Sequence, residues 1–513
     1  MTEQFSLYGN PLRPADAQKA ADWQQMFMRK FSYDPGERYD LSLVDNEYLG
    51  AIFGLKNIVR DGGGTPIHAD SGVVLGTVRM GFGHYRIAMA GASAARAMGF
   101  TPLWLDLLSI PGITSDVINW WNTRYSRFSR LSQRSRFFNQ RVWEAVTTGN
   151  DTLPGLSWAL NNYAAGWPWR FLKANARDYR MSELFGPMHS ALPSDIPILT
   201  AHMWNCMGAV AGGMTNVVDM MFDNWPMAFQ LTEGAKHGVQ SPSGYYGFRT
   251  MNGFDEDDEI LKPVPADALH YVGHHVDHEL VENIEIDCRQ RLERMHDGQP
   301  RRFLLTMGGA GAQRDLFKAI IEHVIPMIQR NEITLFVNLG DHTDNWKWLR
   351  KQLGSFANRV LLHTSWDETQ TLADDMHTGP TTGLHVFLYD NIYHAVYSTN
   401  YLMRVVDVLI TKPSELAFYP VPKILNERVG GHEAWGAIRA AELGDGTIEM
   451  RSIPRTLQAI DLLAGEHDLL EMFCDSIVKN KSIGIYDGAY KCVALATGRE
   501  WVRQTPASPT GDQ

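Results

Sequence analysis

The chain has 513 residues, enough for two or three domains that each bury a full core. Apolar residues make up 44% and charged residues 20%, as in soluble globular proteins. The net charge of −11 argues against general nucleic-acid binding, which needs a basic surface. No run of 18 apolar residues occurs, and the first residues lack the basic and apolar regions of a signal peptide. We therefore expect neither a transmembrane helix nor a signal peptide.

Cysteine usage indicates the compartment. The four cysteines are scattered, and no two have the close spacing of a zinc or redox motif. We therefore expect reduced thiols in a cytoplasmic protein. The histidines His274, His275 and His278 are close together, but no acidic or cysteine partner is fixed by spacing, so no metal is predicted.

The first α/β half is expected to begin near Ser71. The preceding residues, 1–64, have mixed character with one helix over 15–31, and we interpret them as an extension packed on this first half. The continuous apolar run 73–78 predicts a parallel strand buried on both faces. A glycine-rich turn, a helix of small residues over 87–99 and a second apolar strand come next, which predicts a βαβ unit.

Residues 117–143 differ from the rest of this half. Six arginines alternate with aromatic residues, and no acid occurs between Asp116 and Glu144. One interpretation is an amphipathic helix on a membrane surface, with arginines at lipid phosphates and aromatic rings in the interface. The other is a solvated helical excursion whose aromatic side chains pack on the domain. The sequence leaves both open.

Later elements repeat the alternation of strands and helices. In the first half, short strands are expected at 196–200 and 217–222, the second ending at Asp223, and a loop is expected over 248–259. The second half is expected to run as helix 279–295, strand 303–307, helix 315–329, strand 333–339, helix 346–353, strand 360–363, an irregular stretch 376–400, strands 405–411 and 423–425, and helices 433–443, 455–463 and 467–478.

Two glycine-rich turns, each between a buried strand and a helix, are the first candidate site. Such a turn presents bare backbone N–H groups to a phosphate at a helix N-terminus, although a tight turn without a ligand has the same sequence. The turns contain Gly81, Phe82 and Gly83 in the first half, and Gly308, Gly309, Ala310, Gly311 and Gln313 in the second.

His84 comes directly after the first turn, at the start of a helix. The helix dipole there favours the neutral imidazole, which is the form that a general base for a hydroxyl group needs. The alternative is a histidine that caps the helix or lines a cleft. The sequence therefore makes His84, or Asp223 at the end of the later strand, the candidate catalytic base.

Two polar segments come after strands of the second half. Lys412, Ser414 and Glu415 stand directly after strand 405–411, and ligands in open α/β sheets bind at the carboxyl ends of strands. A carboxylate there can accept both hydroxyls of a ribose, while an exposed loop is the alternative. The second segment, which could place polar groups on a sugar, contains Gly431, His432 and Glu433.

Together these segments resemble the GT-B glycosyltransferases. The turn ending in His84 is similar to the glycine-rich loop of the group that contains the peptidoglycan N-acetylglucosaminyltransferase and the monogalactosyldiacylglycerol synthases. The run 423–433 is similar to the donor-site segment of the galactolipid synthases, with His432 where glutamine is usual. The loop 412–422 is shorter than in that family, and the segments 1–64 and 376–400 have no counterpart.

The resemblance implies an α/β fold of two Rossmann-like domains facing across a cleft, with C-terminal helices crossing back. The domains expected are 1–64 (extension), 65–278 (acceptor), 279–465 (nucleotide-sugar) and 466–513 (helices and tail). It further implies an inverting transfer of a hexose from a nucleotide-diphosphate sugar, typically UDP-linked, to the hydroxyl of a lipid or small molecule. No metal or other cofactor is required, because backbone amides and Lys412 can carry the leaving charge.

Three alternatives remain open. A nucleotide-sugar epimerase on the same fold would turn over donor without an acceptor. A dinucleotide-dependent oxidoreductase could use Asp106 to read a ribose, although neither glycine turn has the third glycine of that motif. A non-catalytic protein could have kept the cleft. A peripheral position on the inner face of a membrane depends on segment 117–143, and the sequence does not indicate the oligomeric state.

Overall fold

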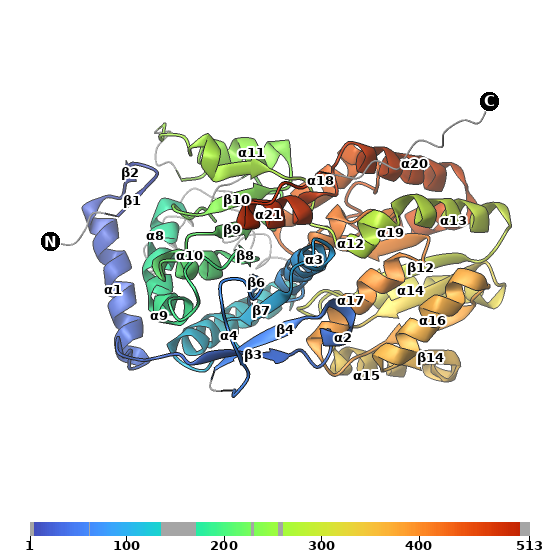
Figure 1. Cartoon of the computed structure of the whole chain (residues 1–513). Coiled ribbons are helices and arrows are strands. Elements are labelled where there is room, and N and C mark those ends of the chain that lie inside the picture. Colours follow the sequence, from blue (N-terminus) through green and yellow to red (C-terminus); the bar gives the residue numbers. More distant parts are fainter. Residues whose placement is uncertain (1–4, 61, 135–170, 227–229, 255–259, 503–513) are drawn as a thin grey trace, which may run out of the picture.

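The computed structural model describes residues 5–60, 62–134, 171–226, 230–254 and 260–502. Two sheets, each covered by helices, form two α/β domains that lie side by side (Figure 1). The first sheet contains β3 to β11 in the order β11-β10-β9-β8-β6-β7-β4-β3-β5. The second contains β12 to β17 in the order β14-β15-β13-β12-β16-β17.

The first sheet is parallel from β11 to β4, because each strand there is followed by a crossover. Its strands are β3 (Leu41–Asp45), β4 (Lys56–Arg60), β5 (Thr65–Pro66), β6 (Val73–Thr77), β7 (Pro102–Asp106), β8 (Ile198–Thr200), β9 (Val217–Met220), β10 (Lys236–Val239) and β11 (Leu269–Tyr271). β3 pairs antiparallel with β4 and β5. Part of segment 1–64, expected as an extension packed on the first half, therefore forms strands of the first sheet itself.

The helices of this part cover both faces of the sheet (Figure 1). They are α1 (Pro14–Lys30), α2 (Gly50–Phe53), α3 (Gly83–Ala97), α4 (Ile113–Arg134), α8 (Phe171–Ser182), η2 (Glu183–Phe185), α9 (Gly186–His189), α10 (Met203–Ala211), α11 (Pro242–Arg249) and η3 (Ala266–Ala268), with a small hairpin of β1 (Ser6–Leu7) and β2 (Asn10–Pro11) at the N-terminal end. The predicted βαβ unit is β6-α3-β7. Its strands are fully buried, and the small residues of α3 let the helix lie close to the sheet.

The second sheet is parallel throughout. Its strands are β12 (Arg301–Thr306), β13 (Ile333–Asn338), β14 (Val360–His363), β15 (Gly383–Phe387), β16 (Val408–Thr411) and β17 (Lys423–Leu425). Its helices are α12 (His278–Glu282), α13 (Ile284–His296), α14 (Arg314–Gln329), α15 (Thr343–Gln352), η4 (Gly354–Arg359), α16 (Trp366–Thr378), α17 (Ile392–Met403), η5 (Glu415–Phe418), η6 (Gly431–Glu433), α18 (Ala434–Leu443) and α19 (Ile453–Gly465).

The stretch 376–400 is not irregular, and this prediction is wrong. It contains the end of α16, strand β15 between β14 and β13, and most of α17. The polar residues of α17 concealed the helix, but they are buried and bonded: Asn338 Nδ2 donates to Ser398 Oγ at 3.1 Å and to Thr399 Oγ1 at 2.8 Å. Long-range hydrogen bonds satisfy side chains that in the sequence are typical of a loop.

The C-terminal helices return to the first domain, as predicted. α20 (Asp468–Ser482) packs on α13 of the second domain, whereas α21 (Gly488–Thr497) packs on α3 and β9 of the first. The approach is close, because a Cβ added at Gly238 would lie 2.4 Å from Cys492 Sγ. The chain therefore forms the GT-B architecture: two Rossmann-like domains joined at one side by the returning helices.

The beginning of segment 117–143 packs on the first domain. The Trp121 ring stacks on Trp23 of α1 with centroids 6.0 Å apart, and the Trp120 ring meets Phe27 edge-on at 5.3 Å. These two aromatic residues thus fill space between α1 and α4 instead of facing a membrane. α4 continues to Arg134, and residues 135–143 lie outside the described residues.

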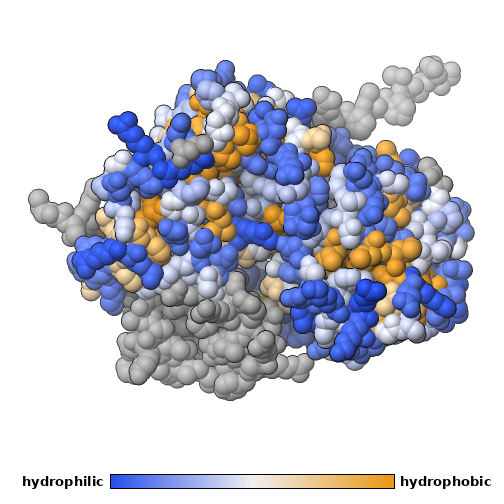
Figure 2. All heavy atoms as spheres, turned by 90° about the horizontal axis from the view of Figure 1, so that it is seen from below, coloured by the Kyte–Doolittle hydropathy of each residue, from blue (hydrophilic) through white to orange (hydrophobic). Residues whose placement is uncertain are grey.

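Seen from below, the surface is mainly hydrophilic, and apolar side chains gather on the second domain (Figure 2). The edge strand β14 lies in this part of the molecule and exposes Leu361 and Leu362.

Among the described helices, none is both long and apolar enough to cross a membrane. All four cysteines are buried free thiols.

Candidate functional site

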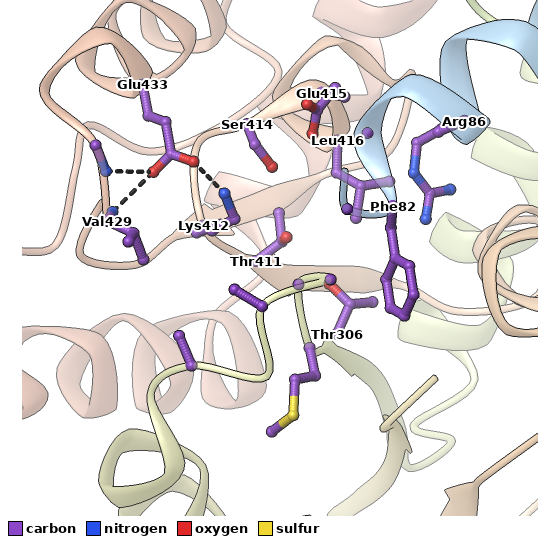
Figure 3. Close-up of a pocket in the computed structure, with 18 of the residues that line it drawn as sticks. Phe82, Arg86, Thr306, Thr411, Lys412, Ser414, Glu415, Leu416, Val429 and Glu433 are labelled. Atoms are coloured by element: carbon purple, nitrogen blue, oxygen red, sulfur yellow. Dashed lines mark hydrogen bonds and ion pairs between the residues drawn. The ribbon is translucent and has the colours of Figure 1, made fainter. Parts of the chain in front are cut away.

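A cleft of about 1160 Å³, including its opening to solvent, lies between the two domains. It is lined by segments that come after the carboxyl ends of β6, β9, β12 and β16, which is where parallel sheets bind ligands. The close-up shows residues of both domains facing this space (Figure 3). The predicted site residues that line it are Gly81, Phe82, Gly83, His84, Asp223, Gly308, Gly309, Ala310, Gln313, Lys412, Ser414, Glu415, His432 and Glu433.

The two glycine-rich turns meet directly across the cleft. A Cβ added at Gly309 would lie 2.4 Å from the Phe82 backbone nitrogen and 2.7 Å from Gly81 Cα. A Cβ at Gly340 would lie 2.6 Å from the Phe82 ring, whose centroid is 5.5 Å from that of His342. A side chain at Gly309 or Gly340 would collide with the first turn. The two domains are therefore in close contact at these turns.

Contacts from α15 and the residue before it hold the second turn through its carbonyl groups. His342 Nε2 donates to Gly308 O at 3.0 Å, and Asn345 Nδ2 donates to Gly311 O at 3.1 Å. Gln313, at φ +69°, then begins α14. Within the described part of the chain, the backbone N–H groups of Gly309 and Ala310 have no hydrogen-bond acceptor. The turn can therefore offer donors and a helix N-terminus to an anion.

His84 has the geometry of a neutral base. Its Nδ1 donates to Ala201 O at 2.8 Å, which leaves the Nε2 lone pair as acceptor. Burial lowers the pKa of His84, and this effect outweighs the nearby Glu415 carboxylate, which raises it. The rings of His202 and Phe222 meet it edge-on, each with a centroid distance of 4.7 Å. The neutral imidazole expected from the helix start is thus enforced by burial as well.

Asp223 of the first domain lies among titratable groups of the second. Burial raises its pKa to about 6, while His432 and Lys412 lower it and Glu415 and Glu433 raise it. These partners come from the second domain, whereas Asp223 lies just after β9 of the first. At neutral pH the carboxylate is ionised but basic enough to take a proton.

Lys412 and Glu433 form an ion pair on the second-domain side (Figure 3). The other Glu433 oxygen accepts from the N–H groups of Val429 at 2.7 Å and Gly430 at 3.2 Å. Burial raises the Glu433 pKa, but Lys412 and His432 outweigh it, so the pKa is lowered. Glu433 thereby fixes the loop that carries His432. The Lys412 side chain passes over the second glycine-rich turn, because a Cβ at Gly308 would lie 3.0 Å from its Cε.

Glu415 points towards the opposite domain. A Cβ at Gly83 would lie 1.9 Å from Glu415 Oε1, so the carboxylate lies against the first turn of α3. An anion is favourable at a helix N-terminus. Its predicted contact with a ribose stays a prediction, and its place beside His84 is a feature that the sequence did not reveal.

Two predicted residues, Gly311 and Gly431, do not line the cleft. Gly311 lies behind the turn, where a Cβ would meet Asn345 and His342. Sequence reasoning also missed lining residues, above all Arg86 and Thr306. The one signal for Arg86 was its position in the first turn of α3, as a charged residue within a helix of small and apolar residues.

The structure disfavours two other candidate sites. Asp106 is buried and accepts from Tyr85 Oη at 2.5 Å and Leu108 N at 2.9 Å, so it does not present a ribose ligand to the cleft. His274 Nδ1 donates to Phe418 O at 2.9 Å, and His278 Nδ1 lies 2.6 Å from Tyr490 Oη. No group of three or more potential metal ligands occurs among the residues that the structure describes.

Two family models match the chain. The Domain of unknown function (DUF6937) matches residues 6–250, and the Domain of unknown function (DUF6938) matches residues 264–497. Their common boundary lies near β11, at the end of the first sheet. No curated protein matches the chain.

Solved structures with similar folds include nucleotide-sugar enzymes at very low sequence identity. UDP-GlcNAc 2-epimerase from Neisseria meningitidis bound to UDP-GlcNAc is 8% identical, with 83% of this chain and 99% of that chain covered and a TM-score of 0.42. The S. aureus MnaA-UDP co-structure is 10% identical, with coverage of 83% and 96% and a TM-score of 0.42. The α,α-trehalose 6-phosphate synthase from Burkholderia multivorans is 10% identical, with coverage of 83% and 98% and a TM-score of 0.40.

Proposed function

We propose that the protein is an inverting glycosyltransferase that moves a hexose from a UDP-sugar to an acceptor hydroxyl. The observation that carries the proposal is the presence of His84 and the second glycine-rich turn in one cleft. We call this turn, residues 308–311, the phosphate turn. A neutral imidazole with its Nε2 free to accept a proton lines the first-domain side, and bare backbone N–H groups line the second. Base and leaving-group site thus flank the space where the sugar would be held.

In this reaction the second domain holds the donor. The backbone N–H groups of Gly309 and Ala310, the start of α14 and Lys412 stabilise the diphosphate as charge develops on it, which is electrostatic assistance to the leaving group. Ser414 and Glu415 contact the ribose, and His432 contacts the hexose. Glu433 supports both by fixing Lys412 and the loop 429–432.

The first domain holds the acceptor and takes its proton. The acceptor oxygen attacks the anomeric carbon from the face opposite the diphosphate, the bond to the diphosphate oxygen breaks, and the hydroxyl proton passes to His84 Nε2. Asp223, with a pKa of about 6, is the second candidate for this proton. Apposition of the domains excludes water and limits hydrolysis of the donor.

The acceptor is a lipid or a small molecule. The resemblance to the galactolipid synthases favours a lipid, and a lipid acceptor would require contact with a membrane surface. Flotation with liposomes tests this point, with and without anionic lipid. A protein that stays at the bottom of the gradient in both cases would favour a small soluble acceptor.

A sugar-nucleotide epimerase is the second candidate, because titratable groups of both domains converge on the same space. Asp223 and His84 come from one side and His432 and Glu415 from the other, as acid–base chemistry on the bound sugar itself would need. The two activities are separated by incubating the protein with UDP-sugar alone. Conversion of the sugar without any acceptor identifies the epimerase.

The proposal is tested by thermal denaturation with nucleotides and nucleotide-sugars. Uridine diphosphate at 100 times its dissociation constant should add about 2.7 kcal/mol to the unfolding free energy and raise Tm. UDP-hexoses should act at least as strongly, and NAD should have no effect. Stabilisation by NAD but not by UDP would refute a sugar-nucleotide site and favour the oxidoreductase alternative.

A further inference from the structure

Arg86 is the charged residue of the cleft that the proposed reaction does not use. It lies in the first turn of α3, is only 4% exposed and lines the cleft. Figure 3 shows its side chain leaving α3 beside Phe82, on the opposite side of the cleft from Lys412 and Glu433. The cleft thus has a cation on each side, one from each domain.

The direct contacts of the guanidinium group are with neutral side chains of the second domain. Its Nη1 donates to Asn400 Oδ1, a neutral amide, at 2.6 Å, and its Cζ lies 5.8 Å from the centre of the Tyr419 ring. Among the described residues, no carboxylate oxygen lies within 4.0 Å of an Arg86 nitrogen. A guanidinium has five N–H donors, and the described residues provide a hydrogen-bond acceptor for one of them.

An acid, Asp277, interacts electrostatically with Arg86. Asp277 is fully buried and accepts a hydrogen bond from Tyr419 Oη at 2.7 Å. Burial, assisted by Glu279, raises the pKa of Asp277 to about 8. Arg86 itself lowers this pKa, so Asp277 balances the charge of Arg86 only in part at neutral pH. A buried charge that is not balanced by the protein is costly, and such groups are typical of sites where a ligand supplies the opposite charge.

A second polar group of the cleft also lacks a partner. Thr306, at the end of β12 beside Gly308, is 6% exposed, and its Oγ1 is buried with no hydrogen-bond partner among the described residues. Thr306 belongs to the second domain, and Arg86 belongs to the first. Both offer donors to the cleft that holds the phosphate turn, so an oxyanion there would satisfy groups from both domains.

We propose that Arg86 binds an oxygen of a phosphate group in the cleft and so joins an anionic ligand of the second domain to the first. The identity of that ligand rests on the proposed function: the phosphate belongs to the diphosphate of the UDP-sugar or to a phosphorylated acceptor. In either case Arg86 is a binding residue.

Calorimetric titration of the full chain with UDP, uridine and inorganic pyrophosphate tests this site. Loss of one charge-assisted interaction should weaken UDP binding by Arg86→Gln about 10-fold to 100-fold, while uridine binding stays unchanged. Arg86→Lys keeps the charge but loses the planar fork, and should give a smaller loss. Arg96→Gln, at the exposed end of the same helix, is the matched control and should bind UDP as the wild type does.

The two sources of the phosphate are separated in a second titration. If Arg86→Gln leaves UDP binding unchanged but abolishes pyrophosphate binding to the UDP-saturated protein, the site takes an acceptor phosphate. Equal binding of UDP and of pyrophosphate by wild type and Arg86→Gln would overturn the proposal, as would a wild type that binds neither anion. If the wild type binds pyrophosphate through Arg86 but does not bind UDP, the proposed function is refuted, whereas the anion site at Arg86 is supported. Thermal denaturation monitors folding, and Arg86→Lys decides the result if Arg86→Gln does not fold.

Discussion

Substitution of Gly309 by alanine should separate the two domains without unfolding either. The added Cβ would lie 2.4 Å from the Phe82 nitrogen and 2.7 Å from Gly81 Cα, against 3.4–4 Å for ordinary contacts. The neighbours are backbone atoms of another domain, so no side chain can yield, and the turns must move apart by about 1 Å. A displacement of about 1 Å at a reacting centre can lower the rate about 10²-fold. We expect that loss in turnover of UDP-sugar by Gly309→Ala.

Three measurements check this reasoning. X-ray scattering of Gly309→Ala should show a larger radius of gyration than the wild type, and UDP affinity should fall because the first domain no longer closes on the ligand. The melting temperature should change little, because the core of each domain is untouched. Gly465→Ala is the control, since a Cβ there meets nothing within 4 Å. A Gly309→Ala protein with wild-type scattering and wild-type turnover would refute the close apposition of the turns.

Three further predictions concern single side chains. His84→Asn, whose amide nitrogen corresponds to Nδ1 and can still donate to Ala201 O, should lower transfer about 10²–10⁴-fold with UDP affinity unchanged, as measured by product formation and calorimetry; full activity would exclude His84 as the base. The pKa of Asp223 is about 6 in the folded protein and 3.8 in the unfolded chain. Its ionisation therefore lowers the free energy of unfolding as the pH rises from about 4 to about 6. Asp223→Asn should therefore stabilise the protein at pH 8, by at most about 3 kcal/mol, but not at pH 3.5, and equal Tm shifts at both pH values would contradict the raised pKa of Asp223. Lys423 and Asp445 form a fully buried ion pair at 2.7 Å, so Lys423→Met should lower the unfolding free energy in urea by about 3–5 kcal/mol. Lys318→Met at a largely exposed pair should cost less than about 1 kcal/mol, and equal losses in the two variants would show that burial of the pair is not the cause.

The fold was predictable where local pattern and burial agree. β6 and the helix α3 were visible because one is an uninterrupted apolar run and the other a row of small residues. β15 and α17 were not, because His385 interrupts the strand pattern and buried polar residues interrupt the helix pattern. These elements are stabilised by contacts such as Asn338 to Thr399, which join residues about 60 positions apart. The periodicity of a single sequence reports only local neighbours, so it could not predict such contacts.

The site was predictable for a different reason. Residues after parallel strands meet at one edge of a sheet, which predicted ligand sites at Asp223 in one domain and Lys412 in the other. The resemblance to GT-B enzymes then placed these two edges across one cleft, where both residues lie. Arg86 could not be predicted in this way, because an arginine in a helix is usually solvent-exposed, and only the packing of α3 against α17 shows that it is buried. Glu433 was identified as a cleft residue, but its role in fixing the loop depends on hydrogen bonds that only the structure shows.

The contacts that hold the domains together differ in strength along the cleft, and this difference indicates how a ligand enters. At the rim, Arg79 of the first domain pairs with Asp341 of the second, but Arg79 is 50% exposed, so the pair contributes at most about 1 kcal/mol. On the other side, α21 buries its apolar residues against α3 and β9 and continues from α20 of the second domain. Opening the rim at this pair therefore costs little, whereas separating α21 from α3, or α3 from α17, would expose core. The expected motion is a hinge about the returning helices that parts Phe82 from the phosphate turn, admits the donor and then restores the apposition on which His84 and Arg86 depend.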